Sequence, residues 1–269
     1  MSGMHATAGN GVAGTTAERV LDLLDPAPAV PVFTRGYLDL IGETPPKPTG
    51  LADRLMRTWI VPVIYQRWWR PAFSLLLMGV AGPGMAGEYR LARSWLGLSP
   101  GDTLLDVACG PGNFTRELAT GLGDEGLVIG LDTSASMLAR AVRDTSADVA
   151  GGAGIAYVRA DAMDFPLRSR SVDAVCCFAA LNLMREPFGV LDQMTRVLRP
   201  DGRIALMTSC RRGGGGALGA VSDLVGRLAG TAIFGRDEIT DALAQRGYTR
   251  IRQRVAGAVQ FVAGQLAGS

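Results

Sequence analysis

The chain has 269 residues, 48% of them hydrophobic and 19% charged, which is enough for one globular α/β domain with a sizeable core, alone or with an appendage. Its 27 basic and 25 acidic residues leave a formal net charge of +2, without the concentrated basic face that binding of nucleic acid requires. We therefore expect no nucleic-acid partner.

The N-terminal third is broken into pieces by its composition. Residues 1–18 are rich in Gly, Ala and Thr and show no hydrophobic period, which predicts a disordered tail. Prolines interrupt the region that follows, and residues 59–78 have helical character on either side of Pro71. We predict that residues 19–86 form an N-terminal arm and helical cap, followed by one domain over residues 87–269.

Strand-like and helix-like runs alternate through the second part of the chain. The expected strands are residues 103–108, 127–132, 155–161, 172–178 and 203–209, and the expected helices are residues 114–121 and 188–198, with a further helix beginning at residue 136. This alternation predicts a Rossmann-like, doubly wound, mostly parallel sheet with helices on both faces. Residues 249–255 and 259–262 read as an antiparallel pair that closes the sheet, for seven strands in all.

Residues 104–118, LLDVACGPGNFTREL, place a small-residue elbow between a strand and a helix. Gly110 and Gly112 let the backbone approach a ligand that a Cβ would repel, and the helix N-terminus offers unpaired N–H groups. A dinucleotide-binding loop requires a third glycine where this chain has Thr115. The elbow therefore predicts a ligand site without matching the dinucleotide pattern.

Two acids narrow the choice of ligand. The carboxylate of Asp106, before the glycines, can accept hydrogen bonds from a ligand ammonium or from neighbouring backbone N–H groups, and it would repel a pyrophosphate. Asp132 follows the glycines by about 20 residues, where a carboxylate can bind both hydroxyls of a ribose. These features suit a ligand with a ribose, a cationic amino acid end and no phosphate.

At this point the chain resembles a known family. The segments LLDVACGPGNFTREL, VIGLDTSASMLARA, VRADAMDFPL, VDAVCCFAALNL and VLRPDGRIAL are similar, in order and spacing, to successive motifs of the class I S-adenosylmethionine-dependent methyltransferases, over roughly residues 88–210. The resemblance is to the ubiquinone/menaquinone C-methyltransferase-like group, methyltransferase type 11. It implies S-adenosyl-L-methionine as donor substrate and no metal.

The resemblance also implies a set of donor-binding residues. They are Asp106, Ala108, Cys109, Gly110, Gly112, Asp132, Thr133, Met137, Asp161, Ala162, Met163 and Phe178. Ala108 stands where the family has its first elbow glycine, and Asp161 resembles the acid that hydrogen-bonds the adenine amino group. Read singly, Asp132 also suits a helix N-terminus, Asp161 an ordinary turn and Met137 the core.

The acceptor is less well specified, because in-line methyl transfer depends on alignment more than on acid–base groups. The chain's single histidine, His5, lies in the tail and is not expected to act as a base. Asn182 lies in a stretch that resembles the quinone C-methyltransferases, whose acceptor is an electron-rich ring; the other interpretation is a helix cap. The sequence names no catalytic residue, and Asn182 is a candidate for orienting the acceptor.

Two further segments are candidates for a lid over the acceptor. Tyr65, Arg67 and Trp69 lie in an aromatic and basic run whose members either contact the acceptor or dock on the sheet while the arginines stay hydrated. Four consecutive glycines at 213–216 predict a hinge, so that residues 210–236 form a flexible hinge and helical flap.

Cysteine usage and hydropathy bear on location. Cys109, Cys176, Cys177 and Cys210 show no CxxC spacing, which argues against structural zinc or a disulfide framework and favours a reducing cytoplasm. The first residues lack the pattern of a signal peptide. No uninterrupted apolar stretch reaches the roughly 18 residues needed to cross a bilayer, although peripheral membrane contact stays open.

The sequence thus predicts a cytoplasmic, metal-independent methyltransferase, monomeric or homodimeric, that acts on a small, partly apolar acceptor by C- or O-methylation of a quinol- or phenol-like group. Three alternatives stay open. They are O-methylation of a sugar or lipid hydroxyl, a non-catalytic module that binds S-adenosylmethionine, and a nicotinamide oxidoreductase.

Overall fold

The structure is a computed structural model that describes residues 10–42, 84–146, 152–211 and 231–268. Its centre is a nine-stranded sheet in the order β1-β2-β5-β4-β3-β6-β7-β9-β8. The strands are β1 Phe33–Thr34, β2 Tyr37–Asp39, β3 Thr103–Val107, β4 Leu127–Asp132, β5 Gly154–Arg159, β6 Val172–Phe178, β7 Leu198–Ser209, β8 Tyr248–Ala256 and β9 Val259–Leu266. The six strands from β2 to β7 run parallel, and β1, β9 and β8 pair antiparallel to their neighbours.

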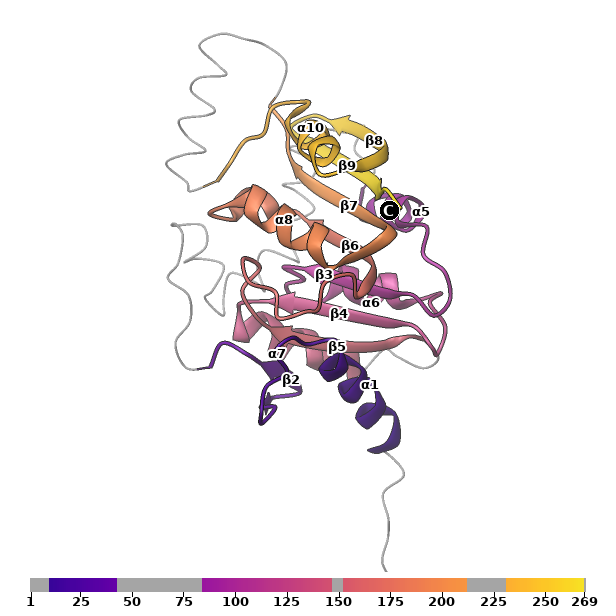
Figure 1. Ribbon diagram of the computed structural model, residues 1–269, viewed down its shortest axis with the longest axis vertical. Helices are drawn as coiled ribbons and strands as arrows, with labels where there is room; N and C mark the ends of the chain where they lie inside the picture. The colour runs from indigo at the N-terminus through magenta and orange to yellow at the C-terminus, as the bar shows by residue number, and fades with distance from the viewer. Residues whose placement is uncertain (1–9, 43–83, 147–151, 212–230, 269) are drawn as a thin grey trace, which may run out of the picture.

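Helices cover both faces of the sheet, as Figure 1 shows. They are α1 Asn10–Asp22, α5 Gly84–Leu96, α6 Asn113–Ala119, α7 Ala135–Ser146, α8 Pro187–Val197 and α10 Glu238–Gln245, with a short 3-10 turn, η2, at Leu181–Leu183. Side chains of α1, α8 and α10 share one core cluster with the strands, and those of α5, α6 and α7 pack in the clusters of the opposite face. The Rossmann-like architecture predicted from the sequence is confirmed.

The central strands explain why the parallel sheet was visible in the sequence. Every residue of β3 is buried, because the strand has neighbours on both sides and helices over both faces. All seven predicted strands are present as β3 to β9, and β4 and β6 have the predicted bounds. The bounds of β3, β5, β8 and β9 differ from the predicted ones by one to four residues. The largest difference is at β7, which begins at Leu198 because the turn-like sequence at 199–202 continues the strand beside an irregular register in β6.

Two additional strands come from the N-terminal arm, so the sheet has nine strands where seven were predicted. Arg35 and Gly36 have φ of 51° and 86°, and these left-handed conformations form the two-residue turn that joins β1 to β2. Strand β2 then pairs in parallel with β5, with Asp39 opposite Arg159. The described part of the arm therefore extends the edge of the sheet.

The tail differs from its prediction as well, since α1 begins at Asn10 inside the segment expected to be disordered. Val20 and Leu24 are buried in the core, and Arg19 donates hydrogen bonds to the carbonyls of Glu125 and Gly126 just before β4. These contacts anchor the C-terminal end of α1 and the residues after it to the main sheet. Residues 43–83 of the arm and cap predicted over residues 19–86 lie outside the described residues.

The expected flap is described only at its end. Residues 231–235 contain no helix and run beside the end of β7, where Arg211 N donates to Phe234 O and Ser209 Oγ donates to Ala232 O. The glycine hinge and residues 212–230 lie outside the described residues. Within the part of the chain that the structure describes, no helix has the length and apolar character needed to span a membrane.

Candidate functional site

The candidate site lies where the parallel strands β3, β4, β5 and β6 end. Because parallel strands have their carboxyl ends at one edge of the sheet, the loops after them meet there. The predicted donor residues occupy these positions: residues 106–112 at the end of β3, 132–137 at the end of β4, 161–163 after β5, and Phe178 at the end of β6. The fold therefore brings the predicted donor set to one edge.

The elbow after β3 is built from three left-handed residues. Ala108, Gly110 and Gly112 have φ of 56°, 56° and 76°. Ala108 carries a Cβ in this conformation, at a cost of about 1 kcal/mol. Cys109 holds the turn in place, because its N–H donates to the carbonyl of Leu131 on β4 at 3.0 Å.

The two glycines of the elbow face different surroundings. A Cβ built on Gly110 meets no atom within 4 Å, whereas one on Gly112 would lie 2.3 Å from Tyr157 Oη and 3.2 Å from Ala141 Cβ. Tyr157 is 4% exposed and its hydroxyl hydrogen-bonds Thr145 Oγ1 at 2.8 Å. Gly112 is therefore required for packing, and Gly110 leaves open space beside the backbone.

Asp132 ties the elbow to the loop after β4. Its Oδ2 accepts from Gly110 N at 2.9 Å, and its Oδ1 accepts from Ser134 N at 2.8 Å. The side chain is half-buried at the end of the strand. Each carboxylate oxygen has a second lone pair, so the group can shape the elbow and still accept hydrogen bonds from hydroxyls.

Asp106 differs from the sequence interpretation. Its Oδ2 accepts from Thr115 Oγ1 at 2.6 Å and its Oδ1 accepts from Cys176 Sγ at 3.5 Å, and the residue is only 2% exposed. Burial raises the pKa of the carboxyl to about 6, despite the hydrogen bonds from Thr115 and Cys176. The described partners of this carboxyl are thus two side chains, one on α6 and one on β6, and no backbone N–H.

The loop after β5 is a tight turn. Asp161 Oδ1 accepts from Met163 N at 2.9 Å, which is the turn role considered as an alternative for this residue. Ala162 is 9% exposed, and Met163 is 39% exposed, which is unusual for a large apolar side chain. The side chain of Met163 is thus partly exposed, and its end lies beside Gly189 on α8.

The loop after β4 is fixed by an arginine that the sequence analysis missed. Arg159 Nε donates to Thr133 O at 3.1 Å, and Met137 N donates to Ser134 Oγ at 3.4 Å. The side chain of Met137 is 6% exposed, which agrees with its alternative interpretation as a core residue.

Aromatic rings flank the end of β6, and a buried thiol lies in the elbow after β3. Phe178 stacks on Phe114 with centroids 4.3 Å apart and an interplanar angle of 16°, and Tyr89 meets Phe114 edge-on at 4.6 Å. Burial raises the pKa of the Cys109 thiol well above its ordinary value, with the nearby acids adding to the effect. The thiol is therefore protonated and unsuited to act as a nucleophile.

Asn182 lies on η2, just after β6, and is half-buried. Its main-chain carbonyl accepts from Ala232 N at 2.7 Å, so it borders the described end of the segment predicted to form the flap. The caps of η2 and of α8 are Ala180 and Glu186, so the interpretation of Asn182 as a helix cap is wrong. The other acceptor candidates, Tyr65, Arg67 and Trp69, lie outside the described residues.

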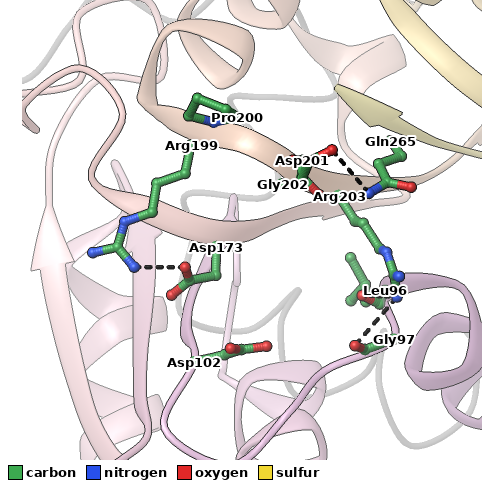
Figure 2. A pocket seen from close by; sticks show the side chains of 10 residues that line it. All are labelled: Leu96, Gly97, Asp102, Asp173, Arg199, Pro200, Asp201, Gly202, Arg203 and Gln265. Atoms are coloured by element: carbon green, nitrogen blue, oxygen red, sulfur yellow. Dashed lines mark hydrogen bonds and ion pairs between the residues drawn. The ribbon is translucent and has the colours of Figure 1, made fainter. Parts of the chain in front are cut away.

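A cavity of about 330 Å³ lies at the other edge of the sheet, at the amino ends of β3 and β6 (Figure 2). Its lining is Leu96, Gly97, Asp102, Asp173, Arg199, Pro200, Asp201, Gly202, Arg203 and Gln265. Figure 2 shows these polar groups bonded to one another, with Arg199 paired to Asp173 at 2.5 Å and Arg203 Nη1 donating to Gly97 O at 3.2 Å. This cavity is separate from the candidate site.

Residues 105–206 match a family described as a methyltransferase domain. Two uncharacterised chloroplastic methyltransferases of Arabidopsis thaliana are 36% and 31% identical over 56% and 77% of this chain, which spans 42% and 59% of their lengths. A 2-phytyl-1,4-naphtoquinone methyltransferase of Synechococcus elongatus is 36% identical over 44% of this chain and 50% of its own. The resemblance drawn from the motifs is thereby confirmed, although this chain covers only part of each relative.

Solved structures show the same fold at low identity. A SAM-dependent methyltransferase from Aquifex aeolicus is 19% identical, with a TM-score of 0.55 over 77% of this chain and 98% of that one. A phosphoethanolamine N-methyltransferase of Haemonchus contortus, solved with S-adenosyl-L-methionine, has a TM-score of 0.63 at 14% identity over 80% of this chain and 59% of that one. The [4+2]-cyclase SpnF also matches, with a TM-score of 0.59 at 15% identity over 84% of this chain and 99% of that one, so the fold by itself does not specify the reaction.

Proposed function

Because residues 105–206 of this chain match the methyltransferase domain family, we propose that it is an S-adenosylmethionine-dependent methyltransferase acting on a small, partly apolar acceptor of quinol or phenol type. The observation that carries the proposal is the pairing of an open Gly110 with the carboxylate of Asp132 at the strand ends. The acceptor class is taken from relatives named as naphthoquinone methyltransferases and as a ubiquinone/menaquinone biosynthesis C-methyltransferase.

The described residues fit such a donor. The space at Gly110 admits a ligand against the backbone, and the carboxylate of Asp132, half-buried beside it at the end of β4, is an acceptor of the kind that suits ribose hydroxyls. Asp161 and Met163 follow the next strand, where a carboxylate oxygen and a partly exposed apolar side chain suit an adenine ring. We assign no ligand contact to Asp106, because its carboxyl is buried and hydrogen-bonded to Thr115 and Cys176.

The donor supplies a methyl group on a sulfonium, and the protein has to align an acceptor with it and exclude water. Asn182 lies beside the end of β6, and its amide can hold a hydroxyl or carbonyl of the acceptor without removing a proton. An acidic phenol or enol ionises largely by itself, whereas a sugar or lipid hydroxyl needs a base. The absence of histidine after residue 5 therefore favours the quinol or phenol class.

Replacing Asp132 with alanine is expected to weaken binding of S-adenosylhomocysteine by about 1–3 kcal/mol, since the ribose hydroxyls lose their acceptor. Isothermal titration calorimetry measures the difference from wild type. Asp102→Ala is the matched control, because Asp102 also accepts a backbone N–H, from Ser99 at 2.8 Å, but at the opposite edge of the sheet. Wild-type protein that binds neither form of the nucleoside would contradict the proposed function, and equal affinity of Asp132→Ala would contradict the assigned residue.

Replacing Asn182 with alanine is expected to reduce turnover by about tenfold or more and to leave donor affinity unchanged, because the side chain orients only the acceptor. The measurement is transfer of labelled methyl to a panel of quinols, phenols, glycosides and fatty acids. Gln193→Ala, on the surface of α8, controls for the loss of an amide. Equal changes in turnover and donor affinity would mean that the acceptor site lies elsewhere.

The same panel distinguishes the alternatives. Label transferred to glycosides or fatty acids would favour O-methylation of a sugar or lipid hydroxyl, and donor binding without transfer to any acceptor would favour a non-catalytic module. We also propose a reducing compartment, the cytoplasm, because Cys109, Cys176, Cys177 and Cys210 are free and buried. The Arabidopsis relatives carry chloroplastic names, and those names are not transferred to this chain.

A further inference from the structure

A buried ion pair joins the N-terminal arm to the main sheet. Arg159 Nη1 lies 2.9 Å from Asp39 Oδ2, and each side chain is 11% exposed. Asp39 ends β2 and Arg159 ends β5, and the two residues are partners in the register of these parallel strands. The same Nη1 donates to the carbonyl of Gly42, also at 2.9 Å, so the guanidinium holds the chain on both sides of the turn that follows β2.

The guanidinium also reaches the candidate donor site. Arg159 Nε donates to the carbonyl of Thr133 at 3.1 Å, one residue beyond Asp132. The register places Arg159 directly beside Asp132, and Ala160 N donates to Asp132 O at 3.3 Å. One side chain thus joins residues 39 and 42 of the arm to the loop that carries the expected ribose-binding carboxylate.

Backbone hydrogen bonds fix the carboxylate of Asp39 in addition to the ion pair. Its Oδ1 accepts from the backbone N–H groups of Ile41 and Gly42 at 3.1 and 3.0 Å. Burial alone would raise the pKa of Asp39, but the hydrogen bonds from Arg159 and from these two amides outweigh it and hold the pKa below its usual 3.8. The pair is therefore ionised throughout the neutral range.

A buried ion pair is weak evidence for stability, because desolvation offsets most of the attraction. A planar guanidinium does what an apolar side chain of similar size cannot: it fixes three acceptors on two separate segments in one geometry. The arrangement therefore fits a role in holding the loop around Thr133 in position.

We propose that Arg159 is a positioning residue for the donor site, and that its ion pair with Asp39 couples docking of the N-terminal arm to binding of the nucleoside. The coupling rests on the proposed function, since it assigns the ribose to Asp132. The positioning does not, because it concerns the loop in the unliganded protein. An arm that is displaced would release the Thr133 loop, and a bound nucleoside would hold the arm in place by the same linkage.

The test uses the full chain with Arg159→Met, Arg159→Lys and Asp39→Asn. Arg203→Met is the matched control, because Arg203 also donates to main-chain carbonyls, those of Leu96 and Gly97, at the opposite edge of the sheet. Titration with S-adenosylhomocysteine and hydrogen exchange of a peptide covering residues 131–138 are measured for each protein. Arg159→Lys and Asp39→Asn keep the experiment decisive should Arg159→Met fail to fold.

We expect Arg159→Met to weaken nucleoside binding roughly tenfold, about 1.4 kcal/mol, and to speed amide exchange in residues 131–138. Arg159→Lys and Asp39→Asn should show the same two changes to a smaller extent. Combining Arg159→Met with Asp39→Asn should weaken nucleoside binding no more than Arg159→Met alone, because both substitutions remove the same ion pair. Arg203→Met should lower the melting temperature without either change.

Three outcomes would overturn the proposal, and they differ from failure of the proposed function. If wild-type protein does not bind the nucleoside, the proposed function is refuted. If amide exchange in residues 131–138 is unchanged in the Arg159 and Asp39 variants, the positioning role is refuted, whether or not the wild type binds. Wild-type protein that binds, with variants that bind equally well, refutes the coupling alone. Weakened binding in Arg203→Met to the same extent as in Arg159→Met would mean that general destabilisation explains the result.

Discussion

Replacing Gly112 with alanine is expected to lower the free energy of unfolding by about 2–4 kcal/mol, the sum of a strained backbone and an overpacked core. Gly112 has a φ of 76°, and an added Cβ would lie 2.3 Å from Tyr157 Oη and 3.0 Å from Tyr157 Cζ. The ring cannot move away easily, because Tyr157 is buried and hydrogen-bonded to Thr145. Chemical denaturation followed by circular dichroism measures the loss.

Gly110→Ala separates the two contributions. Gly110 has a similar φ of 56° but open space where its Cβ would lie, so its substitution should cost only the backbone strain, about 1 kcal/mol. In the proposed function this Cβ would meet the bound donor, so Gly110→Ala should weaken nucleoside binding more than it lowers stability. Adding Tyr157→Phe to Gly112→Ala should restore part of the lost stability. Equal losses in the two glycine variants would contradict the packing assigned to Gly112.

The sequence predicted the sheet well because its strands are continuous apolar runs bounded by polar residues. Strands β4 and β6 begin and end where predicted, and the elbow, Asp132 and Asp161 come to one edge of the sheet for the topological reason given in advance. These features depend on local pattern and on the rule that parallel strands share an edge. They are therefore readable without knowing any tertiary contact.

The features that the sequence did not reveal depend on contacts between distant residues. The β1–β2 hairpin is only a few residues long, and it is stabilised by pairing with β5 more than 100 residues away. Arg159 and Asp39 are 120 residues apart in the sequence, and no local sequence pattern around either residue predicts their contact. Thr115 was noticed only as a missing glycine, although its hydroxyl is what satisfies Asp106.

Replacing Asp106 with asparagine is expected to stabilise the protein by up to about 3 kcal/mol above pH 7, and by little near pH 4. Burial raises the pKa of Asp106 from 3.8 to about 6, so the folded state holds the proton more tightly than the unfolded state does. The stability that protonation contributes is present below about pH 4 and is lost as the pH rises through about 6. Asparagine fits the site, because its oxygen can accept from Thr115 while its amide faces the sulfur of Cys176.

Denaturation of both proteins at intervals from pH 4 to pH 8 measures the difference, and Asp192→Asn, on the surface of α8, controls for the loss of one negative charge. The gain in stability should grow with pH only in the Asp106 variant; a gain that is the same at both ends of the range would contradict the shifted pKa.

The affinity of Asp106→Asn for the nucleoside tests whether the carboxylate of Asp106 contacts the ligand. Because the carboxyl is buried, at 2% exposed, and hydrogen-bonded to Thr115 and Cys176, affinity should stay within about twofold of wild type, a difference of about 0.4 kcal/mol. A large loss of affinity in this stable variant would return Asp106 to the ligand-binding role that the sequence motif implied.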